Sequence, residues 1–218
     1  MSSYALVLPP PWVRIHLQEP DRMRESVRAY VEARARRAPK EIPPDQLAAL
    51  KVKLQGQLVR QLEESRDGGT IDYYLPSGPL HGVDLNASFV VSSLIPDANA
   101  DAAQASAVHT LLGAEGATAV VIAGTHWSRS EAVVTTEGDQ LVEAGLPARR
   151  ITYTTAVPGD ERRWALVTCT VIGDGNPDSD HTQLVVELFD AIMTTWRWDP
   201  AAPKGGSAPS ATAVEATS

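Results

Sequence analysis

The chain has 218 residues, of which 43% are hydrophobic and 21% charged, as in ordinary globular proteins with a sizeable core. It has no apolar run near the roughly 18 residues that a membrane-spanning helix needs, and Met1–Leu8 lacks the basic start of a secretory signal. The single cysteine, Cys169, excludes an intramolecular disulfide and a cysteine-based zinc site, and the sequence as a whole predicts a cytoplasmic protein.

The formal net charge of −8 is unevenly distributed along the chain. Residues 21–66 hold 11 Lys and Arg against 7 Asp and Glu, a net charge of +4, so the remainder carries −12. An acidic protein that does not interleave basic and aromatic residues binds nucleic acid poorly, because phosphate recognition needs clustered cations. We therefore expect no nucleic-acid partner.

The N-terminal half predicts two strands, two helices and two further strands. Alternating apolar residues indicate strands, and apolar residues three or four apart indicate helices. In chain order the strands and helices are expected at 4–8, 12–17, 21–37, 43–67, 70–75 and 85–94. The break between the two helices is short, so we expect an inserted helical hairpin that carries the basic residues.

The C-terminal half predicts mainly strands. A helix is expected at 98–112, strands at 117–123, 130–136, 151–157 and 164–172, and a last helix at 178–198. The first two strands flank Gly124, which indicates either a hairpin or one bent strand pair. Residues 199–218 are rich in Ala, Pro, Ser, Gly and Thr without periodicity, which is typical of a disordered tail.

The order of these elements predicts the fold class. Strands and helices do not alternate regularly, as they would in a parallel α/β sheet. We expect an α+β fold with a mainly antiparallel sheet covered by helices and the inserted N-terminal helical hairpin. Residues 1–198 are expected to form a single domain, followed by the tail.

The motifs that could carry chemistry are incomplete. Asp174–Asp180 begins like a calcium loop, but Ser179 stands where glycine is needed and Val185 where a bidentate Glu is needed. We interpret this segment as a turn with Asx caps before the last helix. Cys169 lies in an alternating strand and is expected to be buried. We assign no catalytic, cofactor-binding or metal-binding residue and no cofactor.

The closing segments carry a resemblance to known proteins. Val157–Asp160, Arg163–Val167, Ile172–Gly175 and Leu188–Trp198 resemble an uncharacterised actinobacterial family, which also begins with an element like Leu8–Ile15. This C-terminal portion is also similar to the Mog1/PsbP-like fold, an antiparallel sheet covered by helices. The resemblance implies binding of proteins or cofactor complexes and not catalysis, and some related actinobacterial proteins act around specialised secretion systems, including type VII secretion.

The first functional hypothesis is a non-enzymatic protein–protein interaction module, either an adaptor or a secretion-associated accessory protein. It rests on the basic hairpin, since arginine and apolar side chains together are typical of partner interfaces. The expected partner-binding residues lie at the hairpin tip: Arg34, Arg36, Arg37 and Lys40. The sequence does not indicate the identity of the partner or the oligomeric state.

Two alternatives stay open at this point. One is a small-ligand-binding domain with a pocket between the sheet and the first helices. The other is an enzyme with an unfamiliar site around His126, Arg129 and Glu131. A deep pocket with converging polar groups would favour either alternative, whereas a flat exposed apolar patch on the hairpin would favour the interaction module.

Overall fold

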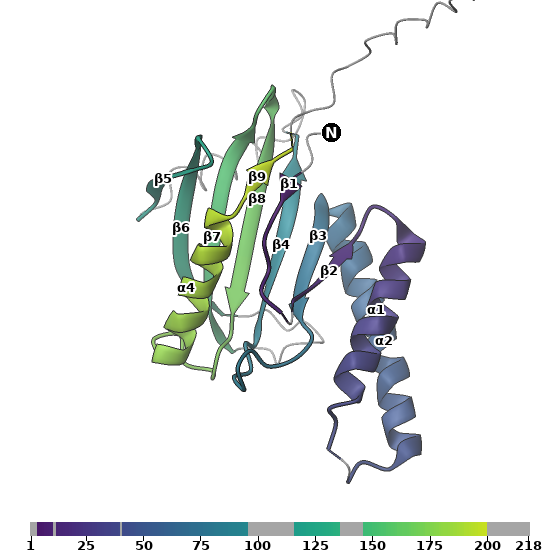
Figure 1. Cartoon of the computed structure of the whole chain (residues 1–218). Coiled ribbons are helices and arrows are strands. Elements are labelled where there is room, and N and C mark those ends of the chain that lie inside the picture. The colour runs from purple at the N-terminus through teal and green to yellow at the C-terminus, as the bar shows by residue number, and fades with distance from the viewer. Residues whose placement is uncertain (1–3, 11, 40, 96–115, 136–145, 200–218) are drawn as a thin grey trace, which may run out of the picture.

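The computed structural model describes residues 4–10, 12–39, 41–95, 116–135 and 146–199, which form a mixed α+β fold (Figure 1). Seven strands of this described part make one antiparallel sheet. In spatial order they are β2 (Trp12–His16), β3 (Thr70–Pro76), β4 (Ala87–Leu94), β8 (Asp160–Val171), β7 (Pro147–Val157), β6 (Thr125–Thr135) and β5 (Thr118–Ile122). The predicted α+β class with a large antiparallel sheet is confirmed.

Three helices and a short two-stranded ladder complete the described part of the chain. The helices are α1 (Pro20–Ala35), α2 (Pro44–Asp67) and α4 (Asp180–Thr194). The ladder joins β1 (Tyr4–Ala5) to β9 (Arg197–Trp198) in antiparallel register, so segments from the two ends of the chain lie side by side (Figure 1). The first predicted strand, at 4–8, is therefore much shorter than expected.

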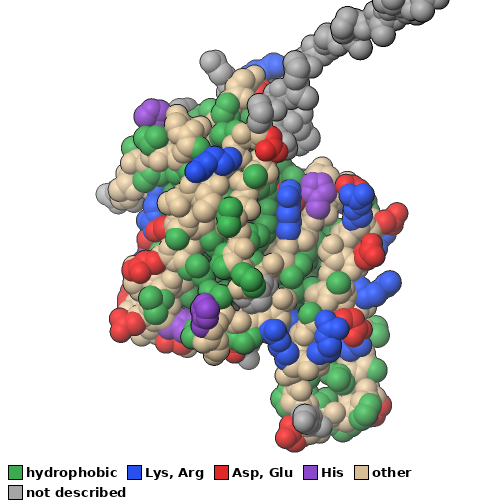
Figure 2. Space-filling model, in the orientation of Figure 1, with side chains coloured by type: hydrophobic (Ala, Val, Ile, Leu, Met, Phe, Trp, Pro, Cys, Tyr) green, Lys and Arg blue, Asp and Glu red, His purple; other side chains and the backbone are tan. Residues whose placement is uncertain are grey.

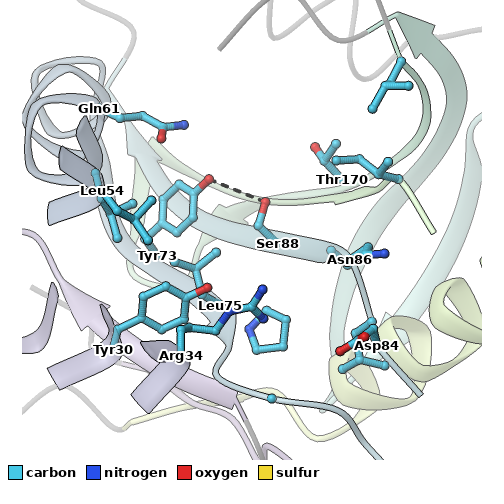
Figure 3. Close-up of a pocket in the computed structure, with 17 residues that line it drawn as sticks. Tyr30, Arg34, Leu54, Gln61, Tyr73, Leu75, Asp84, Asn86, Ser88 and Thr170 are labelled. Atoms are coloured by element: carbon cyan, nitrogen blue, oxygen red, sulfur yellow. Dashed lines mark hydrogen bonds between the residues drawn. The ribbon is translucent and has the colours of Figure 1, made fainter. Parts of the chain in front are cut away.

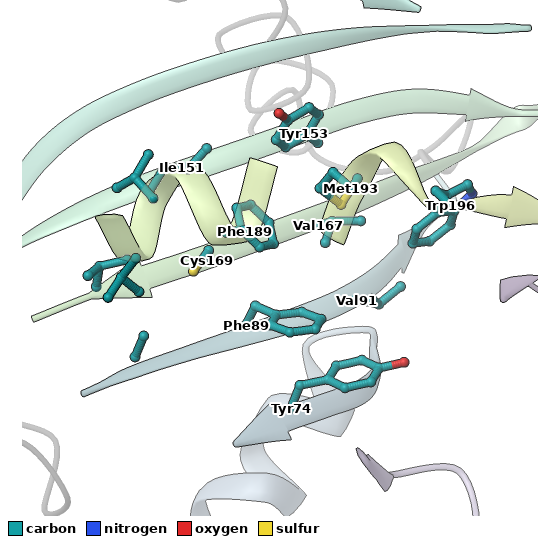
Figure 4. Packing of buried hydrophobic residues seen from close by; sticks show 14 of the residues in the cluster. Tyr74, Phe89, Val91, Ile151, Tyr153, Val167, Cys169, Phe189, Met193 and Trp196 are labelled. Carbon is teal, nitrogen blue, oxygen red and sulfur yellow. The ribbon is translucent and has the colours of Figure 1, made fainter. Parts of the chain in front are cut away.

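Two apolar cores lie on opposite faces of the sheet, because neighbouring residues of a strand point to opposite sides. Between α4 and the sheet, Phe89 and Cys169 meet Phe189 (Figure 4). On the other side, Ile15 of β2 packs with Val27 of α1 and Leu58 of α2. The sheet therefore separates an α4 side from an α1–α2 side, and the pair of helices α1 and α2 is called the α1–α2 pair below.

The burial of Cys169 confirms the expectation from its strand pattern. Its side chain is 1% exposed within the core on the α4 side. Burial raises the pKa of the thiol well above its usual range, because the thiolate would lose its hydration. At neutral pH Cys169 is thus a protonated, apolar packing residue.

The turn before the last helix also has the expected caps. The backbone N–H of Asn176 donates to Asp174 Oδ1 at 3.1 Å, and the N–H of Asp178 donates to Asn176 Oδ1 at 3.0 Å. Ser179 caps the helix by accepting from the backbone N–H of Thr182 at 3.1 Å. Asp174 Oδ1 and Asn176 Oδ1 are therefore used for local backbone hydrogen bonds.

β5 and β6 form a hairpin, which settles the two options that Gly124 left open. Ala123 and Gly124 link the strands with φ angles of 49° and 76°. Two consecutive residues with positive φ are typical of the tight turns that match the twist of paired strands. β6 consequently begins at Thr125, five residues before the strand expected at 130–136.

The last helix ends earlier than predicted. A helix over 178–198 would place Leu184 and Trp196 in one apolar stripe, but α4 stops at Thr194 and Leu184 is 66% exposed. Val186 and Met193 are buried on α4 instead. The chain leaves the helix because β9 pairs with β1, and tertiary pairing of this kind overrides helix propensity.

Three expectations concern residues outside the described ranges. They are the helix at 98–112, the tail beyond Asp199, and the position of Lys40. They stay predictions.

Candidate functional site

A cavity of about 450 Å³ lies between the α1–α2 pair and the sheet (Figure 3). Side chains from the consecutive elements α1, α2, β3 and β4 reach it, together with side chains from β8, which is distant in the sequence. Ligand sites in proteins commonly have volumes of about 300–1,000 Å³ and combine apolar walls with a few polar groups. The size of this cavity falls within that range.

The floor of the cavity is a row of hydroxyl groups on neighbouring strands. Tyr73, Ser88 and Thr170 point to the α1–α2 side because their strand neighbours point to the α4 side. Ser88 and Thr170 are direct partners in the β4–β8 register. The Tyr73 hydroxyl donates to Ser88 Oγ at 3.5 Å, which is long for a hydrogen bond.

The walls of the cavity are mainly apolar and come from α2 and β3. Leu54, Leu58 and Gln61 face it from successive turns of α2, because residues three and four apart share one helix face. Leu75 faces it from β3. Since Leu58 also belongs to the core with α1, the wall is held in place by the packing that joins the two helices.

Two charged side chains line the cavity within the described part of the chain, Arg34 of α1 and Asp84 of the segment before β4. Tyr30 lies one helix turn before Arg34 and also faces the cavity (Figure 3). Burial raises the pKa of the Tyr30 phenol, and the nearby positive charge of Arg34 opposes this rise without cancelling it. Tyr30 is therefore a protonated hydrogen-bond donor at neutral pH.

Arg37 lies beside Gly78, one of the residues that line the cavity. Its Nη1 donates to the carbonyl oxygen of Ser77 at 3.0 Å, which ties the end of α1 to the segment after β3. A Cβ atom added at Gly78 would lie 1.0 Å from that same Nη1, so the guanidinium lies directly against the glycine. The missing side chain at Gly78 gives Arg37 this space.

The structure describes three of the four residues expected at a common partner-binding tip, and their contacts differ. Arg34 lines the cavity, whereas Arg37 is bound to Ser77. Arg34, Arg36 and Arg37 are all exposed, and Lys40 lies outside the described residues. Sequence reasoning missed the cavity role of Arg34, although the four-residue spacing from Tyr30 already places both side chains on one face of the helix.

The site suggested around His126, Arg129 and Glu131 does not form. His126 is exposed and lies on the opposite face of β6 from Arg129 and Glu131, as the alternation of a strand requires. Arg129 makes two hydrogen bonds to Asp190 of α4, at 3.0 and 2.9 Å. Glu131 accepts from Arg129 and from Arg149 of β7, so it holds the guanidinium that joins the sheet to Asp190 of α4.

The ionisation of Glu131 fits this clamping role. Burial alone would raise the pKa of its carboxyl, but hydrogen bonds from Arg149 and Arg129 lower it below its usual range. The carboxylate is thus ionised at neutral pH and occupied by two guanidinium groups. It is not a poised general acid or base.

A buried carboxylate on the α4 side was not anticipated from the sequence. Asp72 has no exposed side-chain surface and accepts from Arg14 at 2.8 and 2.7 Å, from His16 at 2.8 Å and from the Tyr4 hydroxyl. Tyr74 lies 2.8 Å from the same Tyr4 hydroxyl. Arg14 and His16 alternate along β2, so the sequence places both side chains on one face of the strand. Only the pairing of β2 with β3 shows that Asp72 lies across from them.

Asp72 is an ionised carboxylate that stabilises the fold through its hydrogen bonds. Burial would raise the pKa of its carboxyl, but the hydrogen bonds from Arg14, Tyr4 and His16 lower it below its usual range. Both oxygens are already occupied by side chains of β1 and β2. The cavity on the α1–α2 side, where polar groups face open space, is therefore the better candidate site.

Known sites and relatives add no further assignment. The described residues contain no group of three or more His, Cys, Asp or Glu able to hold a metal ion. None of the helices in the described ranges is both long enough and apolar enough to cross a membrane. Comparison with family models, with curated proteins and with solved structures finds no match for this chain.

Proposed function

We propose that this chain is a binding module that takes a small molecule into the cavity between the α1–α2 pair and the sheet. The observation that carries the proposal is the convergence of five elements on one space of about 450 Å³. Its leucine walls offer apolar contact, while its hydroxyl floor offers directional hydrogen bonds. This combination of apolar walls and a few polar groups supports the ligand-binding alternative.

A neutral fluorescent probe tests the proposal directly. N-phenyl-1-naphthylamine brightens in an apolar site, so a titration of the wild-type chain should saturate with a single class of sites. Changing Ser88→Trp on the cavity floor, or Leu54→Trp on its wall, should weaken this binding at least tenfold, because the indole occupies the space. Circular dichroism verifies that each variant is folded.

The matched control is Val121→Trp on the edge strand β5, where the side chain is 63% exposed and lies outside the cavity. It introduces the same residue into the same sheet and should leave the affinity within about twofold, as expected for a surface change. Equal weakening by Val121→Trp and Ser88→Trp would show that the probe binds elsewhere, and a lack of saturable binding would refute the proposal.

A second candidate function is the protein–protein interaction module. Its support is the far end of the α1–α2 pair, where Leu50 and Val52 are 53% and 71% exposed and Arg36 is also exposed. Figure 2 shows hydrophobic side chains at this end of the molecule with Lys and Arg side chains next to them. Interfaces favour such mixtures of apolar groups and arginine.

We expect the triple change Arg36→Glu, Leu50→Ser and Val52→Ser to reduce partner recovery at least fivefold in a quantitative pull-down. These side chains are exposed, so the melting temperature should change little. Val121→Ser, an exposed change on the opposite edge of the fold, is the control. Undiminished recovery with the triple variant would remove this end of the α1–α2 pair as an interface.

We also propose the finer fold and the cellular role that the resemblance implies. The antiparallel pair β7–β8 followed by α4 supports a Mog1/PsbP-like arrangement, with the α1–α2 pair as the inserted helical hairpin. An adaptor or secretion-associated role, a cytoplasmic location and the absence of nucleic-acid binding are proposed with it, on the sequence arguments given above.

A further inference from the structure

We infer that the ligand of the cavity is a small amphipathic anion, whose negative group binds Arg34 and Tyr30 while its apolar part contacts the leucine wall. This inference rests on the proposed function, since it names the ligand class for the same cavity. It follows from the charges, the donors and the apolar surfaces that face the space.

The charge of Arg34 is available to a ligand. Arg14 pairs with Asp72 and Arg129 pairs with Asp190, but Arg34 forms no salt bridge within the described part of the chain. Its guanidinium also lines the cavity (Figure 3). A guanidinium offers five N–H donors in a planar fork that matches carboxylate, sulfonate and phosphate groups.

Tyr30 supplies a second donor beside the guanidinium. It lies one turn before Arg34 on α1 and faces the same cavity, and its phenol is a donor at neutral pH, as an ordinary tyrosine is. Hydrogen bonds from a neutral donor or a guanidinium to an ionised acceptor are stronger than those between neutral groups. An anionic group at this position would therefore receive donors from both side chains.

The rest of the cavity suits an apolar body with few polar atoms. Leu54, Leu58 and Leu75 form the wall, and Ser88 with Thr170 forms the hydroxyl floor. Asp84 is the other charged residue of the lining, and its carboxylate repels an anion. The negative group of the ligand is thereby directed to Arg34, and its uncharged part faces the strands.

Two probes with the same aromatic skeleton separate the effect of charge from that of shape. N-phenyl-1-naphthylamine is neutral, and 1-anilinonaphthalene-8-sulfonate adds one sulfonate to it. We expect the wild-type chain to bind the sulfonate about tenfold more tightly, which corresponds to about 1.4 kcal/mol. Arg34→Gln should remove this difference in affinity between the two probes, and Tyr30→Phe should reduce the difference about threefold.

Arg36→Gln is the matched control, because Arg36 is an exposed arginine two residues further along that does not line the cavity. It should preserve the preference for the sulfonate. If the neutral probe binds in the cavity but the sulfonate binds no more tightly, the anion inference is overturned and the cavity remains a ligand site. A preference that Arg34→Gln and Arg36→Gln reduce equally also overturns it, and failure of both probes to bind overturns the proposed function as well.

Discussion

Replacing Asp72 with Asn should lower the free energy of unfolding by about 2–4 kcal/mol, since breaking a buried ion pair leaves its partners without a counter-charge. Asp72 is fully buried and accepts hydrogen bonds from Arg14, His16 and Tyr4. The upper end of the usual range for buried pairs is not reached, because the Arg14 side chain is 46% exposed and water compensates part of its loss.

Urea unfolding at pH 7 measures this change. The matched control is Asp21→Asn, an isosteric change at a carboxylate that is fully exposed on α1, and it should alter the stability by less than about 0.5 kcal/mol. Equal effects of the two substitutions would show that the contacts of Asp72 contribute no net stability.

The loss of stability caused by Asp72→Asn should depend on pH. The pKa of Asp72 is lower in the folded chain than in the unfolded chain, so the unfolded state binds this proton more tightly. The stability contributed by the carboxylate is therefore complete above the unfolded pKa of about 3.9 and is lost as the pH falls through the folded pKa. The difference in stability between wild type and Asp72→Asn should shrink below about pH 4, and a constant difference from pH 7 to pH 3 would contradict the assignment.

Strand alternation and helix spacing in the sequence are sufficient to predict most elements of the described fold. The burial of Cys169 and the faces of Val27 and Leu58 follow from these local periods. The same periods mispredict the segment after Thr194, because whether a chain continues as helix or pairs as a strand depends on a distant partner. Here that partner is Tyr4–Ala5, nearly the whole chain away in sequence.

The candidate cavity was foreseen only as a location between the sheet and the first helices. Its lining depends on which strands are neighbours, and Ser88 meets Thr170 only because β4 pairs with β8 across more than 80 residues of sequence. The partner-binding role of Arg34, Arg36 and Arg37 stays a prediction. Their spacing in the sequence did not show that Arg34 lines the cavity while Arg37 binds Ser77.

Replacing Trp196 with Ala should lower the free energy of unfolding by about 3–5 kcal/mol, as expected for truncating a fully buried large aromatic side chain. The Trp196 ring stacks on Tyr4 with centroids 4.3 Å apart and an angle of 6° between the planes. It also makes edge-to-face contacts with Trp127 and Trp198, with distances between ring centroids of 5.1 and 5.2 Å. Its loss therefore removes the packing that holds β1 and β9 against the sheet.

The sharpest control for this prediction is Leu184→Ala. The sequence pattern places Leu184 and Trp196 in one apolar helical stripe, and a single continuous helix over 178–198 would make both substitutions costly. In the structure Leu184 is 66% exposed on α4, whereas Trp196 lies beyond the end of the helix in the aromatic cluster. Urea unfolding should thus show a loss below about 0.5 kcal/mol for Leu184→Ala, and Trp196→Phe should retain part of the stability that Trp196→Ala loses. Similar losses for Leu184→Ala and Trp196→Ala would restore the continuous helix and reject the pairing of β1 with β9.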